Sequence, residues 1–249
     1  MKRAMAAALA ALALMASLAA EAQPNHGAKP DRGAIEKIVR DYLLKNPEVI
    51  EEAIGVLRAK RQEEERRRTE AAIAENGEAL RAHPLSPVSG NAEGDVTVVE
   101  FFDYQCGYCK RALPAMTALL KEDPNVRVVW KEFPILGPVS DFAARASMAA
   151  DRQGGYYPFH LALMKEPELT EGKVLEIAGK TGLDTARLQQ DMLDPAIRAY
   201  IDETRALGQR IGISGTPAFV IGGTLVPGVV DAARMKELVA AARAGADSG

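Results

Sequence analysis

From Asp95 onward, short apolar runs and amphipathic stretches follow one another in an order that few folds can accommodate. The first run, VTVVEFFDY, is rich in β-branched and aromatic residues, which predicts a buried strand. A helix at 107–121 joins this strand to a second one, VRVVWKEFPI, and a helical block follows at 140–211. Two more strands, GTPAFVIGG and TLVPG, then lead to a final helix at 231–243. A β-α-β start and a β-β-α finish therefore enclose a helical insertion.

This order of elements is the thioredoxin layout. The sequence thus predicts an α/β protein with a thioredoxin-like fold and a helical insertion at about residues 140–211. Of the 249 residues, 47% are hydrophobic and 26% are charged, which is typical of a soluble globular protein with a substantial core. The formal net charge of −3 indicates no basic surface, so we expect no nucleic-acid partner.

The chain has two cysteines, Cys106 and Cys109, where the first strand meets the first helix. Cysteines this near in sequence enclose too small a loop to stabilise the fold much, so reactivity explains the pair better than support. The N–H groups and dipole of the first helical turn favour a thiolate at Cys106, the form that attacks disulfides. Cys109 lies about one helical turn further on, within reach to resolve a mixed disulfide.

A metal site is the other use of two thiols. Zinc in structural sites takes four ligands, and the three histidines of this chain, His26, His83 and His160, have no ligand spacing between them. We therefore expect neither zinc nor another cofactor. Two thiolates can bind Cu(I), which leaves a non-enzymatic copper-binding protein as an alternative.

Two further positions are candidates for the site. Glu100 lies inside the first strand, six residues before Cys106. It either faces outward by strand alternation or acts as a buried proton acceptor for Cys109, and the residues alone favour neither. Thr216-Pro217 begins an apolar strand, where proline indicates an edge or a special turn. A cis bond there would lay the Thr216 backbone beside the active sulfur, ready to pair with an extended peptide.

The segments VVEFFDYQCGYCK, VVWKEFPILG, GISGTPAFVIGG and VPGVVD resemble, in order and spacing, the DsbA-like periplasmic thiol–disulfide oxidoreductases. The resemblance covers roughly residues 85–246. It implies a thioredoxin fold with a helical insertion. It makes Cys106 the nucleophile, Cys109 the resolving residue and Thr216-Pro217 the cis-proline pair.

The same resemblance bears on three more residues. It implies the buried-acid role for Glu100, because the family has an acid six residues before its first cysteine. Between the cysteines, Gly107 and Tyr108 stand where the oxidase archetype has Pro-His, which implies a less extreme redox potential. We expect Gly107 and Tyr108, together with Thr216-Pro217, to contact the substrate. A monomeric dithiol oxidase remains an alternative.

Residues 23–75 form a separate, helical region. Apolar residues recur at helical spacing on either side of Asn46-Pro47, and the charged run RAKRQEEERRRTE follows them as a solvated helix or a flexible linker. From Ile35 the pattern is helical, with Ile35, Ile38, Val39, Tyr42 and Leu43 and then Val49, Ile50, Ala53, Ile54 and Leu57. Two short helices cannot bury this stripe alone. We expect it to pack on copies of itself rather than on the main domain.

The segment IEKIVRDYLLKNPEVIEEAIGVL resembles the appended region of the suppressor-of-copper-sensitivity protein C (ScsC) group. Some members of that group are trimers assembled through this segment. The resemblance implies a homo-oligomer, with a trimer suspected. It also implies disulfide isomerase or reductase activity on protein substrates, a membrane reductant of the DsbD or ScsB kind, and a link to copper tolerance.

The first residues have the layout of a secretory signal peptide. Met-Lys-Arg leads into AMAAALAALALMASLAA, and the small residues Ala20 and Ala22 predict cleavage after Ala22. A retained membrane anchor is the alternative, but the apolar stretch of about 17 residues is short for a span that needs ~20. We therefore expect a signal peptide over residues 1–22, an oligomerisation region and linker over 23–75, and a catalytic domain over 76–249 in the periplasm.

Overall fold

The structure is a computed structural model that describes residues 31–246. The chain divides into two compact units, one ending at Lys60 and the other beginning at Arg61. The division lies inside the region predicted for residues 23–75. The predicted signal peptide, with its cleavage after Ala22, lies outside the described residues. None of the helices within residues 31–246 is long and apolar enough to cross a bilayer.

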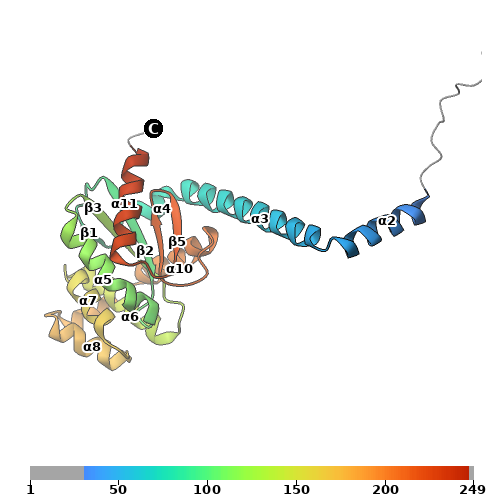
Figure 1. Ribbon diagram of the computed structural model, residues 1–249. Helices are drawn as coiled ribbons and strands as arrows, with labels where there is room; N and C mark the ends of the chain where they lie inside the picture. The colour runs from blue at the N-terminus through green and yellow to red at the C-terminus, as the bar shows by residue number, and fades with distance from the viewer. Residues whose placement is uncertain (1–30, 247–249) are drawn as a thin grey trace, which may run out of the picture. The chain divides into compact units, whose positions relative to one another are not determined.

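A five-stranded mixed sheet forms the centre of the second unit (Figure 1). Its strands are β1 (Val88–Gly90), β2 (Val96–Phe102), β3 (Val126–Glu132), β4 (Ala218–Ile221) and β5 (Thr224–Pro227). They lie side by side in the order β1-β3-β2-β4-β5, with β2 parallel to β3 and every other pair antiparallel. This is the predicted thioredoxin-like arrangement.

Helices join and cover these strands. Helix α5 (Gly107–Glu122) connects β2 to the parallel strand β3, and α11 (Ala232–Ala246) packs against α5. Between β3 and β4, residues 138–210 form the helices α6 (Pro138–Asp151), α7 (Tyr156–Lys165), α8 (Glu171–Lys180), α9 (Thr185–Asp191) and α10 (Pro195–Arg210). Four of them, α7 to α10, pack on α6, so the insertion has a core of its own beside the sheet.

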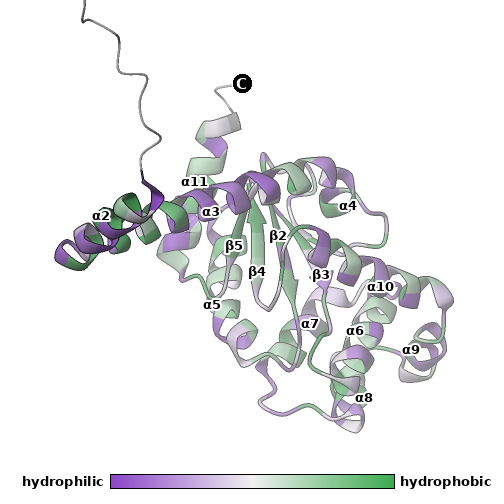
Figure 2. Cartoon of the chain, turned by 90° about the vertical axis from the view of Figure 1, so that its right-hand side faces the viewer, coloured by the Kyte–Doolittle hydropathy of each residue, from purple (hydrophilic) through white to green (hydrophobic). Residues whose placement is uncertain are grey.

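The three central strands of the sheet, β3, β2 and β4, are buried on both faces. Side chains alternate along β2: Val98 and Phe102 pack with α5, α7 and α11, whereas Val99 and Phe101 pack with α10 and the short helix α4 (Gly77–Arg81). Figure 2 accordingly shows β2 and β4 in the colour of hydrophobic residues. By the same alternation, Glu100 lies on the face covered by α5, which is also the face of the cysteines.

Two details of the second unit differ from the sequence prediction. Strand β1 was not predicted, because three residues of mixed character carry too short a pattern, and its pairing with β3 supplies its stability. Strand β3 ends at Glu132 and does not continue through Ile135 as VRVVWKEFPI indicated. Pro134 has no N–H to donate to a neighbouring strand.

The first unit contains α2 (Arg32–Lys45) and the first part of α3 (Glu48–Glu75). Helix α2 begins at Arg32, three residues before the predicted start at Ile35, because the Asp31 side chain accepts a hydrogen bond from the Gly33 N–H and caps it. Across Arg32–Lys45 no residue is buried. Large apolar side chains of this unit are exposed, namely Ile35, Ile38, Val39, Tyr42, Leu44, Ile50, Ile54, Val56 and Leu57.

The charged run that follows is helical. Helix α3 continues to Glu75, so of the two forms predicted for RAKRQEEERRRTE the solvated helix is the one that forms. Glu63 pairs with Arg66 and Arg67, and Arg66 pairs with Glu70, all at three- or four-residue spacing. Such pairs each stabilise an exposed helix by about 0.2–0.5 kcal/mol.

Candidate active site

Cys106 occupies the N-cap of α5. Its backbone is extended (φ −74°, ψ 111°), and its sulfur accepts a hydrogen bond from the Cys109 N–H at 3.4 Å. The Cys106 carbonyl already accepts the Lys110 N–H, so the helix starts directly behind the sulfur. Cys106 is 6% exposed, at the edge of the apolar cluster that α5 covers. The helix thus places an unpaired thiol where its first N–H groups point.

The Thr216 carbonyl lies on the other side of the same sulfur. The peptide bond between Thr216 and Pro217 is cis, which is the isomer that the family resemblance implied. The Cys106 thiol donates to the Thr216 carbonyl oxygen with a separation of 3.3 Å. One residue further on, the Pro217 carbonyl accepts the Gly228 N–H at 2.8 Å, which ties this turn to the loop after β5.

Cys109 differs from Cys106 in its surroundings. It is 1% exposed and packs within the cluster between β2 and α5. Burial raises the pKa of the Cys109 thiol far above its ordinary value, and a negative charge on Glu100 adds to the rise. Hydrogen bonds from the Asp103 backbone and the Thr216 side chain offset part of it. The second thiol is therefore held protonated.

Glu100 is a buried acid, 2% exposed, in the middle of β2. Burial raises its pKa to about 8, with a further contribution from the charge of Cys106. The sequence left its orientation open between solvent and interior, and the structure places it in the interior. Because its pKa lies near neutrality, a small change in its surroundings can make it give up or take up a proton.

The two residues between the cysteines form the exposed start of α5. Tyr108 is 59% exposed, and the Arg111 guanidinium lies 4.1 Å from the centre of its ring. Gly107 has open space around the position of a Cβ atom, so packing does not require glycine there. Both residues lie within one helical turn of the sulfur of Cys106.

Lys110, in the first turn of α5, does not serve the sulfur directly. Its ammonium group donates to the carbonyl oxygens of Glu166 and Pro167, at 2.5 and 3.1 Å. Partial burial lowers the pKa of Lys110. These contacts join α5 to the end of α7 and hold the insertion against α5.

Sequence reasoning missed Asp103, three residues before Cys106. Its carbonyl accepts the Cys106 N–H at 3.1 Å. Its buried carboxylate accepts four hydrogen bonds, from the N–H groups of Gln105, Ile135 and Leu136 and from the Ser140 hydroxyl. Those partners lie 32 to 37 residues away along the chain, apart from Gln105. No local pattern signals such contacts.

A second missed group lies deeper, around Glu132 at the end of β3. One oxygen of its carboxyl accepts hydrogen bonds from the hydroxyls of Tyr104 (3.1 Å) and Tyr156 (2.9 Å). The Tyr104 hydroxyl also lies 3.1 Å from Nδ1 of His160. Burial raises the pKa of Glu132 well above its ordinary value and lowers that of His160 to about 3, so the imidazole is neutral at pH 7. This network anchors Tyr104, two residues before Cys106.

Comparison with known proteins identifies both parts of the chain. Residues 97–241 match the DSBA-like thioredoxin domain, and residues 31–64 match the copper resistance protein ScsC N-terminal domain. Among curated relatives, a Na(+)/H(+) antiporter NhaA of Salinispora tropica is 34% identical over 147 residues. The match covers 56% of this chain but 22% of that protein, so the chain spans about a fifth of the relative's length.

Two solved structures are similar over most of their own length. A thioredoxin-like oxidoreductase from Silicibacter pomeroyi is 50% identical, with a TM-score of 0.66 over 67% of this chain and 97% of that one. A Proteus mirabilis ScsC linker-deletion mutant is 27% identical, with a TM-score of 0.67 over 90% of this chain and all of that one. The chain therefore belongs to the family of DsbA-like thiol–disulfide oxidoreductases of thioredoxin fold, and carries an N-terminal domain of the ScsC type.

Proposed function

We propose that the protein carries out thiol–disulfide exchange on polypeptide substrates through Cys106 and Cys109, as a disulfide isomerase or reductase. The observation that carries the proposal is the contrast between the two thiols. Cys106 caps α5 with its sulfur 3.3 Å from the Thr216 carbonyl oxygen, whereas Cys109 is enclosed and 1% exposed. An extended peptide can pair with the backbone of Thr216 and present its own sulfur to Cys106.

In the first step, the Cys106 thiolate attacks one sulfur of a substrate disulfide. A bond forms between the two sulfurs, the substrate's S–S bond breaks, and the second substrate sulfur leaves as a thiolate that takes up a proton from solvent. The N–H of Cys109, which donates to the Cys106 sulfur, is suited to stabilise the attacking thiolate.

The mixed disulfide then has two outcomes. In isomerisation, another thiolate of the substrate attacks the substrate sulfur of the bond, forms a new substrate disulfide and releases the Cys106 thiolate. In reduction, the mixed disulfide no longer carries the Cys106 charge that contributes to the raised pKa of Glu100, so Glu100 can release its proton to solvent and, as a carboxylate, take the proton of Cys109, which then attacks the Cys106 sulfur. This releases the substrate thiol and leaves a Cys106–Cys109 disulfide, whose two electrons must be restored by a reductant. We propose a membrane protein of the DsbD or ScsB kind for that step.

The N-terminal domain extends the proposal to the assembly. The exposed apolar side chains of α2 and the start of α3 support self-association, with a trimer as the suspected form. An oligomer would surround one substrate with several Cys106 thiolates, which suits scrambled disulfides. The match to the ScsC N-terminal domain supports a role in copper tolerance, and the predicted signal peptide supports a periplasmic location.

Refolding of ribonuclease A tests the activity. We expect the reduced protein to restore activity to scrambled ribonuclease, and the Cys106→Ser variant to be inactive. The Cys109→Ala variant should retain isomerisation but accumulate a mixed disulfide with the substrate, because only the substrate's own thiols can then release Cys106.

Other results would change the assignment. Restoration of activity to reduced ribonuclease alone would identify a dithiol oxidase. Retention of Cu(I) on gel filtration, without exchange on either form of ribonuclease, would identify a copper-binding protein.

A further inference from the structure

A four-residue turn joins strand β2 to helix α5 and ends at Cys106. The Cys106 N–H donates to the Asp103 carbonyl oxygen at 3.1 Å, which closes the turn. Tyr104 and Gln105 occupy its two central positions. The backbone of Asp103 also donates a hydrogen bond to the sulfur of Cys109. The turn therefore contacts both residues of the proposed redox pair, so the contacts that fix its conformation also fix the two sulfurs.

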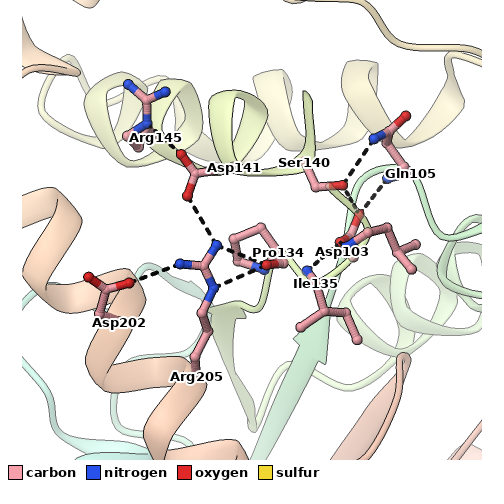
Figure 3. Close-up of polar contacts among 10 residues, drawn as sticks. Asp103, Gln105, Pro134, Ile135, Ser140, Asp141, Arg145, Asp202 and Arg205 are labelled. Atoms are coloured by element: carbon pink, nitrogen blue, oxygen red, sulfur yellow. Dashed lines mark hydrogen bonds and ion pairs between the residues drawn. The ribbon is translucent and has the colours of Figure 1, made fainter. Parts of the chain in front are cut away.

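The first residue of the turn is held by its own side chain. One oxygen of the Asp103 carboxylate accepts the N–H groups of Ile135 and Leu136, in the loop after β3, at 2.8 and 3.0 Å. The other oxygen accepts the Ser140 hydroxyl, at the start of α6, at 2.7 Å, and Figure 3 shows Asp103 reaching both Ile135 and Ser140. One attachment leaves the rest of the turn free to rotate about it, so the orientation of Cys106 depends on a second attachment.

Tyr104 supplies the second attachment. Its side chain is 1% exposed, whereas Gln105, the other central residue of the turn, is exposed. The Tyr104 hydroxyl lies 3.1 Å from Oε1 of Glu132 and 3.1 Å from Nδ1 of His160. Its ring packs edge-on against the rings of Phe102 and His160, with centroids 5.1 and 5.6 Å away. The side chain is thus fixed both by the packing of its ring and by its hydroxyl.

The hydrogen bonds of this hydroxyl run in one direction. The neutral imidazole of His160 carries one N–H, and its Nε2 atom is buried without a hydrogen-bond partner within residues 31–246. The proton therefore belongs on Nδ1, where it is paired. Nδ1–H then donates to the Tyr104 hydroxyl oxygen, and the hydroxyl donates to Glu132. Removing the hydroxyl would leave the imidazole N–H unpaired and the carboxyl with one donor fewer.

The conformation of the turn matters for the charge on Cys106. The Cys106 sulfur accepts the Cys109 N–H at 3.4 Å, and a hydrogen bond weakens steeply when its distance or angle departs from the optimum. A thiolate gains more from such a donor than a thiol does. A turn that shifts would therefore move the sulfur away from this N–H and favour the thiol, the form that does not attack disulfides.

We propose that Tyr104 is a positioning residue for the exchange reaction, which holds the turn so that the Cys106 sulfur keeps its hydrogen bond from the Cys109 N–H. This role rests on the proposed thiol–disulfide exchange. It connects the helical insertion to the reaction, because His160, which contacts the Tyr104 hydroxyl, belongs to α7. The insertion thus acts on the reactive sulfur through the turn.

Two tyrosine variants of the full chain form a matched pair. Tyr104→Phe and Tyr156→Phe each remove one hydroxyl that donates to the same oxygen of Glu132, but Tyr156 lies on α7, outside the turn. Each reduced protein reacts with glutathione disulfide. The Cys106 thiolate forms a bond to one glutathione sulfur, the S–S bond breaks, and the other glutathione leaves as a thiolate that takes up a proton. The initial rate of glutathione release is measured from pH 5 to pH 9.

We expect Tyr104→Phe to release glutathione about threefold more slowly than wild type at pH 6, because less of its Cys106 is ionised. At pH 9 the two rates should be about equal, because alkaline pH ionises the thiol without help from the turn. Tyr156→Phe should follow wild type at every pH. His160→Leu removes only one partner of the Tyr104 hydroxyl, so it should give a smaller loss at pH 6, and it serves if Tyr104→Phe fails to fold.

Wild-type rates at pH 6 in every folded variant of Tyr104 and His160 would overturn the positioning role. An equal loss in Tyr156→Phe would overturn it as well, because general loosening around Glu132 would then explain the effect. So would a loss of the same size at every pH, which indicates a smaller amount of folded protein. A wild-type protein that releases no glutathione at any pH would instead contradict the thiol–disulfide exchange itself.

Discussion

At the scale of single residues, the site separates two cysteines that are three positions apart. The start of α5 presents Cys106 to the Thr216 carbonyl, while Cys109 turns into the cluster with β2. Glu100 shares that interior and holds its proton up to about pH 8, because burial raises its pKa. The arrangement therefore places one thiol, Cys106, at the N-cap of α5, and a second thiol and a buried acid deeper in the same cluster.

Glu100 should make stability depend on pH. Its pKa is about 8 in the folded protein against 4.5 for a free side chain, so between these values the folded state holds a proton that the unfolded state has lost. Wild-type stability should consequently fall as pH rises through this window, relative to Glu100→Gln, by about 1.4 kcal/mol per pH unit. Urea unfolding of both reduced proteins at pH 5, 6, 7 and 8 measures this dependence of stability on pH. If the free energies of unfolding of the two proteins differed by the same amount at every pH, Glu100 would be ionised in the folded protein across this range.

At the scale of elements, the sequence predicted the strands and helices whose residue pattern lies within the element itself. Strands β2 and β4 are largely apolar runs and helix α5 is amphipathic, all with clear boundaries, and the places of Cys106, Cys109 and Thr216 follow from them. The orientation of Glu100 did not follow, because β2 is buried on both faces and strand alternation then offers no polar side.

Other features depend on contacts that are remote in sequence. Strand β1 exists through its pairing with β3, and Asp103 accepts hydrogen bonds from Ile135, Leu136 and Ser140. A single sequence contains no periodic pattern that reveals contacts between residues so far apart in the chain. An aspartate directly after a buried strand and before a reactive cysteine is a hint, but its partners are visible only in three dimensions.

The packing of α10 on the loop after β3 gives a test of this description. A Cβ atom at Gly208 would lie 2.6 Å from Cε2 of the buried Phe133 ring, which precedes the Pro134–Leu136 loop. Gly208→Ala should therefore destabilise the protein by about 1–3 kcal/mol. Alanine's better helix propensity, worth up to ~1 kcal/mol, should not offset this.

Gly179, in α8, is the matched control. A Cβ atom there would lie 3.7 Å from the Thr185 methyl group, an ordinary contact. Gly179→Ala should therefore leave the free energy of unfolding unchanged or raise it by up to ~1 kcal/mol. Urea titrations compare the two variants with wild type. Equal effects at both glycines would contradict the close packing of Gly208 on Phe133.

At the scale of the whole molecule, the two units differ in how their apolar side chains are covered. The second unit, from Arg61, holds all the residues of the proposed redox site, while the first exposes apolar side chains along α2 and the start of α3. Figure 2 shows hydrophobic residues among the hydrophilic ones of α2. Exposed apolar surface of this extent is typical of an association surface.

Charged substitutions on the exposed apolar surface of α2 should prevent assembly. Ile38 is 68% and Leu44 is 70% exposed, so Ile38→Glu with Leu44→Glu should fold normally but lower the mass found by multi-angle light scattering to that of one chain. Leu193→Glu, at a residue 77% exposed in the second unit, is the control and should keep the wild-type mass. A wild-type protein that already has the mass of one chain would contradict self-association.

The contrast between the two thiols can be measured directly by alkylation of the reduced native protein with iodoacetamide at pH 7, with the modified cysteine identified by mass spectrometry. Burial and the raised pKa of Cys109 predict that Cys106 is modified at least about a hundredfold faster, and that Cys109 becomes reactive only on unfolding. Equal and slow modification of both cysteines would contradict the assignment of Cys106 as the nucleophile, and with it the proposed reaction.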